Sequence, residues 1–386
     1  MRILLLSAYD TLSHQKWRLQ LVDGLTQFDW TVLTLAPRYF NYRIRTNALT
    51  WTFSEQEALE KTYDLIIATS LTDITTLRAL NPTITKAPIW LYCHENQFAY
   101  PKSDRQSDTF LMEAKTTFLM NCITANKISF NSNWNRSSAL AGLNKLVKAW
   151  PEKIPTAVIS SIEDKSSVLP VPVQRIKRKQ HIKNISNNMG ANLGMNCITI
   201  IWNHRWEYDK GPEYLLAFVS NIDTLLVKHP TTGIALHIVG QQFRQQPSEF
   251  NELKNIITAL EKNYDNFTRG HWGHCSSDYD YQNLLESSDI VLSTSMHDFQ
   301  GLAIQEAVMA GCIPLLPNHL VYPEIFADEH LYPWSVDPQV CSSNIIKKLS
   351  SWLTNSTPHL PNIDSWSSDI LLPKYKHAIE AIANAS

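Results

Sequence analysis

The segment at residues 297–315, HDFQGLAIQEAVMAGCIPL, combines two carboxylates with a glycine, a small-residue helix and an apolar strand. Asp298 precedes Gly301 and belongs to a loop, whereas Glu306 follows the glycine in a helical pattern that ends at Gly311. A loop acid, a glycine turn and a helix N-terminus together can hold an anion and hydroxyl groups. The segment therefore indicates a loop–helix–strand unit of an α/β fold with a ligand at its loop.

Short β-rich apolar runs recur along the chain, separated by helix-length segments. They read, in chain order, RILLLSAY, WTVLTLAP, DLIIATS, PIWLYCHEN and KISFNSN, then CITIIWNHR, IALHIVGQ, FTRGHWGH, DIVLSTS and CIPLLP. Runs of this kind predict parallel sheets covered by helices on both faces. We therefore predict an α/β fold of two doubly wound, Rossmann-like domains facing a central cleft, with ligands outside the C-terminal ends of the strands.

The length of 386 residues also favours two domains. The first domain is expected at residues 1–173 and the second at 197–360. Between them, residues 174–196 are basic, rich in asparagine and poor in apolar side chains, which indicates a linker. Residues 361–386 have helical content and are expected to pack back on the first domain.

Composition describes a soluble globular protein, with 44% hydrophobic and 18% charged residues. No apolar run reaches the roughly 18 residues of a membrane span, and the six cysteines show no CxxC spacing, which favours reduced thiols in the cytoplasm. Lysine and arginine exceed acids by 23 - 15 = +8 in residues 1–183, while residues 184–386 give 11 - 21 = -10. Either chance with one basic linker, or a first domain that faces a polyanion, explains this asymmetry.

The segment at residues 200–218, IIWNHRWEYDKGPEYLLAF, places two cations after a strand and before an amphipathic helix. Arg205 offers a fork of donors and Lys210 a point charge, and the helix N-terminus lies next to both. These features suit a diphosphate. An ordinary surface pair of cations with a capped helix remains the alternative.

The Arg-x4-Lys-Gly element and the acid-x7-Glu element resemble those of retaining GT-B glycosyltransferases of the family-4 type. LYCHENQFAYP, HRWEYDKGPE, GLAIQEAV, LVYPEIF and RYFNYRIRTNAL further resemble the tRNA-queuosine α-mannosyltransferase family. The resemblance covers both domains and fails mainly around residues 151–196. It implies a GT-B enzyme without metal or cofactor that moves mannose from GDP-mannose to the cyclopentenediol of queuosine in tRNA, with tRNA-Asp expected.

The resemblance also assigns roles around the donor. Glu306 would accept hydrogen bonds from both ribose hydroxyls. Asp298, where the family usually has glutamate, would contact the sugar hydroxyls. Gly301 and Leu302 would present backbone N–H groups to the β-phosphate and the sugar, while Gly273 in RGHWGH would border the nucleotide base.

Catalysis is expected from charge stabilisation. Arg205 and Lys210 would stabilise the departing diphosphate, because the largest developing charge lies there. The sequence offers no well-placed nucleophile, so we expect front-face displacement, with the diphosphate taking the acceptor proton. His94, directly after an apolar strand, would contact the sugar; Glu95 and Asn96 would orient it or touch the acceptor. A purely structural histidine at this strand end is the alternative.

The first strand–helix loop, SAYDTLSHQKW, carries Thr11 and Leu12 where GT-B enzymes often have glycines. Close backbone approach to a phosphate is therefore not expected there. Ser13 and His14 remain candidate contacts to the acceptor.

The segment PRYFNYRIRTN interleaves cations with aromatic rings, a combination that suits a nucleic-acid backbone and a splayed base. The candidate tRNA contacts in it are Arg38, Tyr42, Arg43 and Arg45. An exposed helical insert without a ligand is the alternative. Residues 278–280, DYD, resemble a metal motif, but their position at the start of a helical segment favours a helix cap.

Two other functions stay open. The same chemistry could act on a lipid or saccharide acceptor, although the first domain shows arginine–aromatic clusters rather than an amphipathic basic helix. Alternatively, the chain could be a tRNA- or nucleotide-binding protein without catalysis, because Asp298 replaces glutamate and the N-terminal glycines are missing. The sequence leaves the oligomeric state open.

Overall fold

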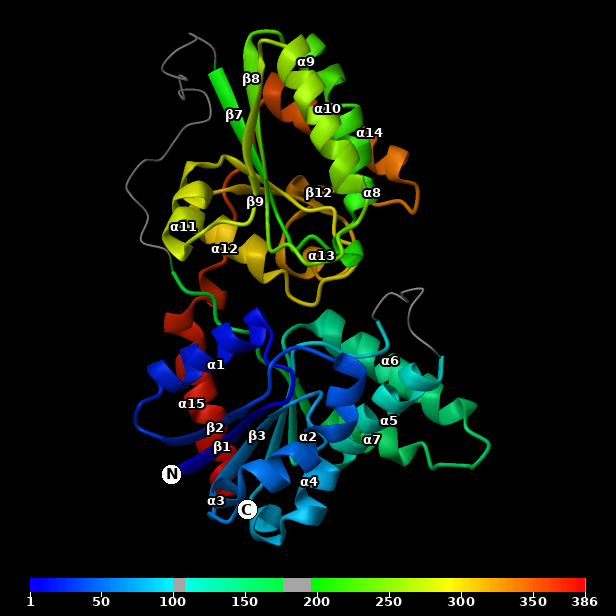
Figure 1. Cartoon of the computed structure of the whole chain (residues 1–386), viewed down its shortest axis with the longest axis vertical. Coiled ribbons are helices and arrows are strands. Elements are labelled where there is room, and N and C mark those ends of the chain that lie inside the picture. The colour runs from blue at the N-terminus through cyan, green and yellow to red at the C-terminus, as the bar shows by residue number, and fades with distance from the viewer. Residues whose placement is uncertain (100–107, 176–195, 386) are drawn as a thin grey trace. The chain divides into compact units, whose positions relative to one another are not determined.

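The structure is a computed structural model in which the described residues are 1–99, 108–175 and 196–385 (Figure 1). The chain divides into two compact units. The first comprises residues 1–172 together with 364–386, and the second comprises residues 173–363. Most of the predicted basic linker, residues 176–195, lies outside the described residues.

The first unit is built on a parallel sheet of six strands in the order β2-β1-β3-β4-β5-β6. Its strands are β1 Arg2–Ser7, β2 Asp29–Thr34, β3 Leu65–Thr69, β4 Ile89–Cys93, β5 Lys127–Phe130 and β6 Ser166–Val168. Its helices are α1 Leu12–Gly24, α2 Phe40–Ser54, α3 Gln56–Leu59, α4 Ile74–Leu80, α5 Asp108–Thr124, α6 Asn133–Ala149, α7 Ala157–Asp164 and α15 Ser368–Asn384. β3 and β4 are buried along their whole length, because helices cover both faces of the sheet.

The C-terminal helix α15 belongs to this unit and lies against α1 (Figure 1). The indole of Trp17 on α1 donates a hydrogen bond of 3.1 Å to the hydroxyl of Tyr375, which donates in turn to the carbonyl of Pro170 at 3.0 Å. Both aromatic side chains are fully buried. The helix is thus fixed by a buried polar contact as well as by apolar packing.

The second unit carries another parallel six-stranded sheet, in the order β12-β11-β10-β7-β8-β9. Its strands are β7 Asn196–Asn203, β8 Thr232–Val239, β9 Phe267–Gly273, β10 Ile290–Leu292, β11 Ile313–Pro317 and β12 Leu331–Tyr332. Its helices are α8 Pro212–Ser220, α9 Asp223–Lys228, α10 Glu249–Asn263, α11 Asp278–Ser287, α12 Leu302–Ala310, α13 Tyr322–Ile325 and α14 Pro338–Thr354. The chain order along the sheet reverses between β7 and β10, the point where ligands bind in folds of this kind.

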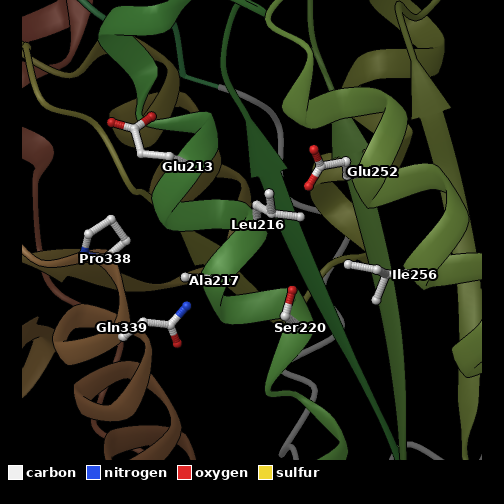
Figure 2. Close-up of a pocket in the computed structure, with 8 residues that line it drawn as sticks. All are labelled: Glu213, Leu216, Ala217, Ser220, Glu252, Ile256, Pro338 and Gln339. Carbon is white, nitrogen blue, oxygen red and sulfur yellow. The ribbon is translucent and has the colours of Figure 1, made fainter.

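Helices α8, α10 and α14 lie together on one face of this sheet, and α11 and α12 lie on the other (Figure 1). A surface groove between α8, α10 and the start of α14 has the aliphatic side chains of Leu216 and Ile256 and the carboxylates of Glu213 and Glu252 in its lining (Figure 2). None of the residues that the sequence singles out as a candidate site lines this groove.

All ten apolar runs that predicted strands contain a strand, and the prediction of two parallel sheets is confirmed. The sequence missed the sixth strand of each sheet, β6 and β12. These strands have three and two residues, too few for a periodic pattern to appear. Among the described residues, no helix combines the length and apolar composition needed to cross a membrane.

Candidate functional site

The candidate site of the second unit lies where β7 and β10 pair and end. The segment after β7 carries Arg205 and Lys210, and the segment after β10 carries Asp298. Because the two strands are parallel neighbours, their carboxyl ends meet, and residues almost ninety positions apart come into contact. Tertiary structure thus unites the two sequence motifs in one cluster.

Lys210 is the centre of this cluster. Its side chain is buried, and its ammonium group donates a hydrogen bond of 2.7 Å to the carbonyl of His297. The same nitrogen lies 3.3 Å from Oδ2 of Asp209 and 3.6 Å from Oδ1 of Asp298. A single buried cation therefore sits between two carboxylates, which keeps its charge compensated inside the protein.

Arg205 lies at the edge of the cluster and is half-exposed. Its guanidinium group forms an ion pair with Glu207 and lies 3.6 Å from Oδ2 of Asp209. Asp209 is therefore shared by both candidate diphosphate-binding cations. The motif WEYDK contains both acids, Glu207 and Asp209, but no role for them follows from the sequence alone.

The two buried acids are held in the charged form. Burial raises the pKa of Asp298, but the Lys210 charge and a hydrogen bond from Tyr322 outweigh it, and the net pKa is lowered. For Asp209, burial likewise raises the pKa, and the charges of Lys210 and Arg205 lower it below its usual value. Both aspartates therefore stay ionised at neutral pH beside Lys210 and Arg205.

Gly301 forms the turn between Asp298 and helix α12. Its backbone is left-handed, with φ of +72°, and an added Cβ would lie 3.1 Å from the ring of Tyr322. α12 begins at Leu302, so the first free N–H groups of this helix follow the glycine directly. This arrangement can hold an anion at the helix N-terminus.

Glu306 lies in the second turn of α12 and is half-buried. Its negative charge adds to burial in raising the pKa of Tyr281 on α11 well above the usual value. The amide of Asn203, at the end of β7, donates to the Tyr281 hydroxyl at 3.0 Å and to the carbonyl of Ala303 at 2.9 Å. Asn203 thus ties both helices to the central strand.

Gly273 ends β9 with a left-handed φ of +100°. Its carbonyl accepts a hydrogen bond from the backbone N–H of Gly240, which follows β8. Gly273 lies at the carboxyl ends of the strands, as Lys210 and Asp298 do. It does not belong to the Lys210 cluster, because β8 lies between β9 and β7. The DYD segment opens α11, as expected; the capping side chain is Ser277, which accepts from the backbone N–H of Asp280.

The first unit brings three predicted residues together. His94 follows β4, and its ring stacks on His14 with centroids 4.1 Å apart. Nε2 of His14 lies 3.2 Å from a carboxylate oxygen of Glu95. Trp17 meets His94 edge-on, with centroids 4.7 Å apart. Burial, together with the neighbouring His14, lowers the pKa of His94 well below its usual value, so His94 is neutral at physiological pH.

Asn96 and Ser13 have different surroundings. The Asn96 amide nitrogen donates to Asn135 at 2.8 Å and to Ser138 at 2.9 Å, while its oxygen accepts from two backbone N–H groups of the following turn. An asparagine side chain has two donors and two acceptor positions, so all are occupied. Asn96 therefore anchors the turn after β4 rather than offering a contact to a ligand. Ser13 is half-buried, with its hydroxyl 3.0 Å from that of Thr11.

The arginine–aromatic segment covers the start of α2. Tyr42 is exposed over 73% of its surface, and Arg38 lies over the ring of the equally exposed Tyr39, 6.0 Å from its centroid. Tyr39 has a left-handed backbone with φ of +53°, a strained conformation for a side chain of this size. Arg43 is half-buried, and Arg45 forms an ion pair with Glu113 on α5. The structure thus places Arg38 and Tyr42 on an open surface and pairs Arg45.

The comparison with family models assigns both units. The N-terminal model of tRNA-queuosine alpha-mannosyltransferase matches residues 2–173, and the model of glycosyl transferases group 1 matches residues 191–363. A tRNA-queuosine alpha-mannosyltransferase of Drosophila melanogaster is 28% identical over 384 residues, which cover 97% of this chain and 95% of the relative. The chain belongs to the tRNA-queuosine alpha-mannosyltransferase family. It is a glycosyltransferase, as the sequence motifs predict.

Solved structures place this family member in the GT-B fold. The Anabaena protein HepE, solved with UDP and glucose, is 16% identical with a TM-score of 0.62, covering 99% of this chain and 100% of HepE. An alpha,alpha-trehalose-phosphate synthase from Burkholderia xenovorans, solved with glucose-6-phosphate, is 11% identical with a TM-score of 0.62, covering 98% and 99%. These similarities establish the fold, and the GT-B prediction is confirmed.

Proposed function

We propose that this protein is a cytoplasmic, retaining enzyme that transfers mannose from GDP-mannose to the cyclopentenediol of queuosine in tRNA, with tRNA-Asp as the preferred acceptor. The match of the first unit to the N-terminal model of tRNA-queuosine alpha-mannosyltransferase supports this acceptor. The Drosophila relative, which is similar over 95% of its own length, is also a tRNA-queuosine alpha-mannosyltransferase. The observation that carries the chemistry is the cluster of Lys210 and Asp298 beside the N-terminus of α12.

The cluster suits a departing nucleoside diphosphate. Negative charge grows on the β-phosphate as its bond to the sugar breaks, and Lys210 and Arg205 supply fixed positive charges near that position. The free N–H groups that follow Gly301 add the partial positive charge of a helix N-terminus. Such charges are aligned before the reaction begins, which is why they stabilise the transition state more than mobile solvent does.

The covalent step exchanges one bond at the anomeric carbon. A hydroxyl oxygen of the acceptor bonds to C1 while the bond from C1 to the β-phosphate oxygen breaks, and the hydroxyl proton passes to that departing oxygen. Attack from the side of the leaving group retains the configuration. Because His94 is neutral, its proposed role is a hydrogen bond to a sugar hydroxyl rather than a positive charge at the transition state.

The exposed surface at the start of α2 is the proposed tRNA contact. Tyr42 offers a ring on which an unpaired base can stack, and Arg38 offers a cation for the phosphate backbone. Arg45 is already paired with Glu113, so we expect it to contribute less than Arg38. Tyr39 presents a second exposed ring beside Arg38.

The test incubates the purified protein with radiolabelled GDP-mannose and two tRNA pools, one containing queuosine and one from cells unable to make it. Label on the queuosine-containing pool alone is the expected result. The same reaction with EDTA should proceed unchanged, because the proposal includes no metal ion. Asp298→Asn, which keeps the shape and removes the charge, should abolish most of the label and serves as the site control.

Other results point to the two remaining functions. Donor hydrolysis without label on either tRNA pool would keep the glycosyltransferase and replace the acceptor by a saccharide or a lipid. Absence of both label and hydrolysis with several nucleotide sugars would indicate a binding protein without catalysis. Loss of labelling with EDTA and its return with a divalent cation would overturn the metal-independent mechanism.

A further inference from the structure

Three buried side chains lead from the end of β7 to Asp298. Nε2 of His204 lies 2.9 Å from the hydroxyl of Ser293, which lies 2.9 Å from the hydroxyl of Tyr322. That tyrosine hydroxyl donates to Oδ2 of Asp298 at 2.8 Å. The exposed surface of His204 is 4%, and Ser293 and Tyr322 have none. All four residues belong to the second unit.

The direction of these hydrogen bonds follows from the groups themselves. An ionised carboxylate only accepts, so Tyr322 gives its one proton to Asp298 and must accept from Ser293. Ser293 in turn gives its one proton to Tyr322, and its oxygen accepts from His204. A proton in every contact therefore requires one on Nε2 of His204. Burial, with the Lys210 charge, lowers the pKa of His204 to about 3, so this histidine is neutral at physiological pH and its Nε2–H tautomer completes the chain.

Tyr322 also supports the other end of the Asp298 loop. A Cβ added to Gly301 would lie 3.1 Å from the ring of Tyr322, which is tighter than ordinary van der Waals contact. Tyr322 therefore lies beside the glycine that directly precedes α12 and hydrogen-bonds the carboxylate three residues before that glycine.

We propose that Tyr322 is the positioning residue of this glycosyltransferase site: its hydroxyl, oriented by Ser293 and His204, holds one oxygen of Asp298 and leaves the other to Lys210 and the donor sugar. The inference rests on the proposed sugar contact of Asp298. An aspartate is one methylene shorter than the glutamate that the family motif usually has, so a fixed direction matters more for its reach. The charged or titratable groups that face Asp298 are Lys210, His204, Asp209 and His297.

Tyr322→Phe tests the proposal, because it keeps the ring against Gly301 and removes only the hydroxyl. The matched control is Tyr332→Phe. Tyr332 is also buried in the second unit, and its hydroxyl donates at 2.9 Å to the backbone carbonyl of Ser293 instead of to Asp298. We expect transfer to fall about tenfold or more in the first variant, the size of a hydrogen bond to a charged group, and to stay within about twofold in the control.

A double-variant cycle asks whether Tyr322 acts through Asp298. In an Asp298→Asn background the further change Tyr322→Phe should cost less than about twofold, because the interaction it would remove is already lost. An equal loss in both backgrounds would overturn the proposal, since Tyr322 would then act on something else. Melting temperatures of all variants show whether any loss of activity comes from unfolding.

Two further measurements distinguish positioning of Asp298 from a general effect on the stability of the site. The ratio of the affinity for GDP-mannose to the affinity for GDP measures the sugar contact. Tyr322→Phe should lower this ratio about as much as Asp298→Asn does and leave the affinity for GDP unchanged. The acid limb of the pH–rate profile should move to higher pH in Tyr322→Phe alone, because the lost hydrogen bond no longer stabilises the Asp298 charge.

The outcomes distinguish this inference from the function on which it rests. A wild-type protein that neither transfers mannose nor binds GDP-mannose would overturn the proposed function and the positioning role with it. A working wild-type protein that is impaired by Asp298→Asn but not by Tyr322→Phe would leave the function standing and overturn the role of Tyr322 alone. Unimpaired Asp298→Asn would overturn the sugar contact and its positioning together.

Discussion

The two units share one architecture and build their candidate sites in different ways. In the second unit, Lys210 and Asp298 are joined by a buried ion pair, and the adjoining helix follows a left-handed glycine. In the first unit, the candidates are a stack of two imidazoles and an exposed arginine–aromatic surface. All positive-φ glycines among the described residues lie in the second unit.

The difference agrees with what each site is proposed to bind. A diphosphate is held by backbone N–H groups, and these can approach it closely only where side chains are absent, as at Gly301. The first loop of the first unit has Thr11 and Leu12 instead, and α1 begins at Leu12. Recognition there would depend on side chains, which suits the proposed acceptor with its hydroxyl groups and bases. The predictions below run from the largest expected effect to the smallest.

Removal of the central cation of the second unit's site, Lys210, should cause the largest loss of activity. Lys210→Met is expected to lower kcat about 100-fold to 1000-fold, because a fixed charge at the developing phosphate charge is lost. Lys228→Met, an exposed lysine of the same unit, is the matched control. Steady-state kinetics with GDP-mannose and queuosine-containing tRNA measures both. Activity of Lys210→Met close to that of the control would contradict the proposed role.

A glycine exchange sharpens the backbone comparison. Gly211→Ala should lower the free energy of unfolding by about 2 kcal/mol or more, since φ is +64° and the new Cβ would lie 2.1 Å from the carbonyl oxygen of Thr294. Gly24→Ala in the first unit would meet only the end of the Leu372 side chain, at 2.6 Å, and should change stability by less than about 1 kcal/mol. Urea unfolding measures both, and equal losses would contradict the distinction.

The pH dependence of stability should draw on both units. Burial lowers the pKa of His94 in the first unit and of His204 in the second, the latter to about 3, whereas an unfolded histidine titrates near about 6.5. Below about pH 6.5 these histidines therefore bind protons in the unfolded chain but not in the folded chain. The free energy of unfolding falls as the pH falls. Each group contributes up to about 1.4 kcal/mol per pH unit until its own folded pKa is reached.

Glutamine variants test this origin. The free energy of unfolding should decline less steeply between about pH 6.5 and about pH 4.5 in His94→Gln and in His204→Gln. In each variant the number of protons taken up on unfolding should fall by up to one. Urea unfolding at several pH values gives the slopes. Slopes identical to that of the wild-type protein would mean that these two histidines do not cause the decline.

The smallest effect is expected on the acceptor side. Tyr42→Ala should raise the KM for tRNA about tenfold, the cost of one lost base stack, and leave GDP-mannose affinity unchanged. Phe53→Ala is the control, because Phe53 is equally exposed at the other end of α2, away from Arg38. A similar rise of KM in both variants would mean that exposed apolar surface, rather than the arginine–aromatic segment, contacts tRNA.

Local sequence patterns predict much of the fold. The apolar runs predict ten strands of the two sheets, because a buried strand needs a continuous apolar stretch of several residues. The motifs around Lys210 and Asp298 likewise mark strand ends followed by helix starts. The edge strands β6 and β12 escape prediction because their two or three residues are recognised only through pairing with a neighbour.

The partners of the site residues are decided by tertiary structure. Lys210 meets Asp298, and His14 meets His94, across about eighty to ninety residues of chain, and such contacts depend on the order of strands in each sheet. The same strand order places Tyr322 next to Asp298. It also places Asn135 where it accepts a hydrogen bond from the Asn96 amide. The sequence by itself determined the residue types and the fold class, since these rest on local hydrophobicity and turn chemistry. Only the packed structure decided which charges neutralise one another, because that depends on distances between segments that no local pattern encodes.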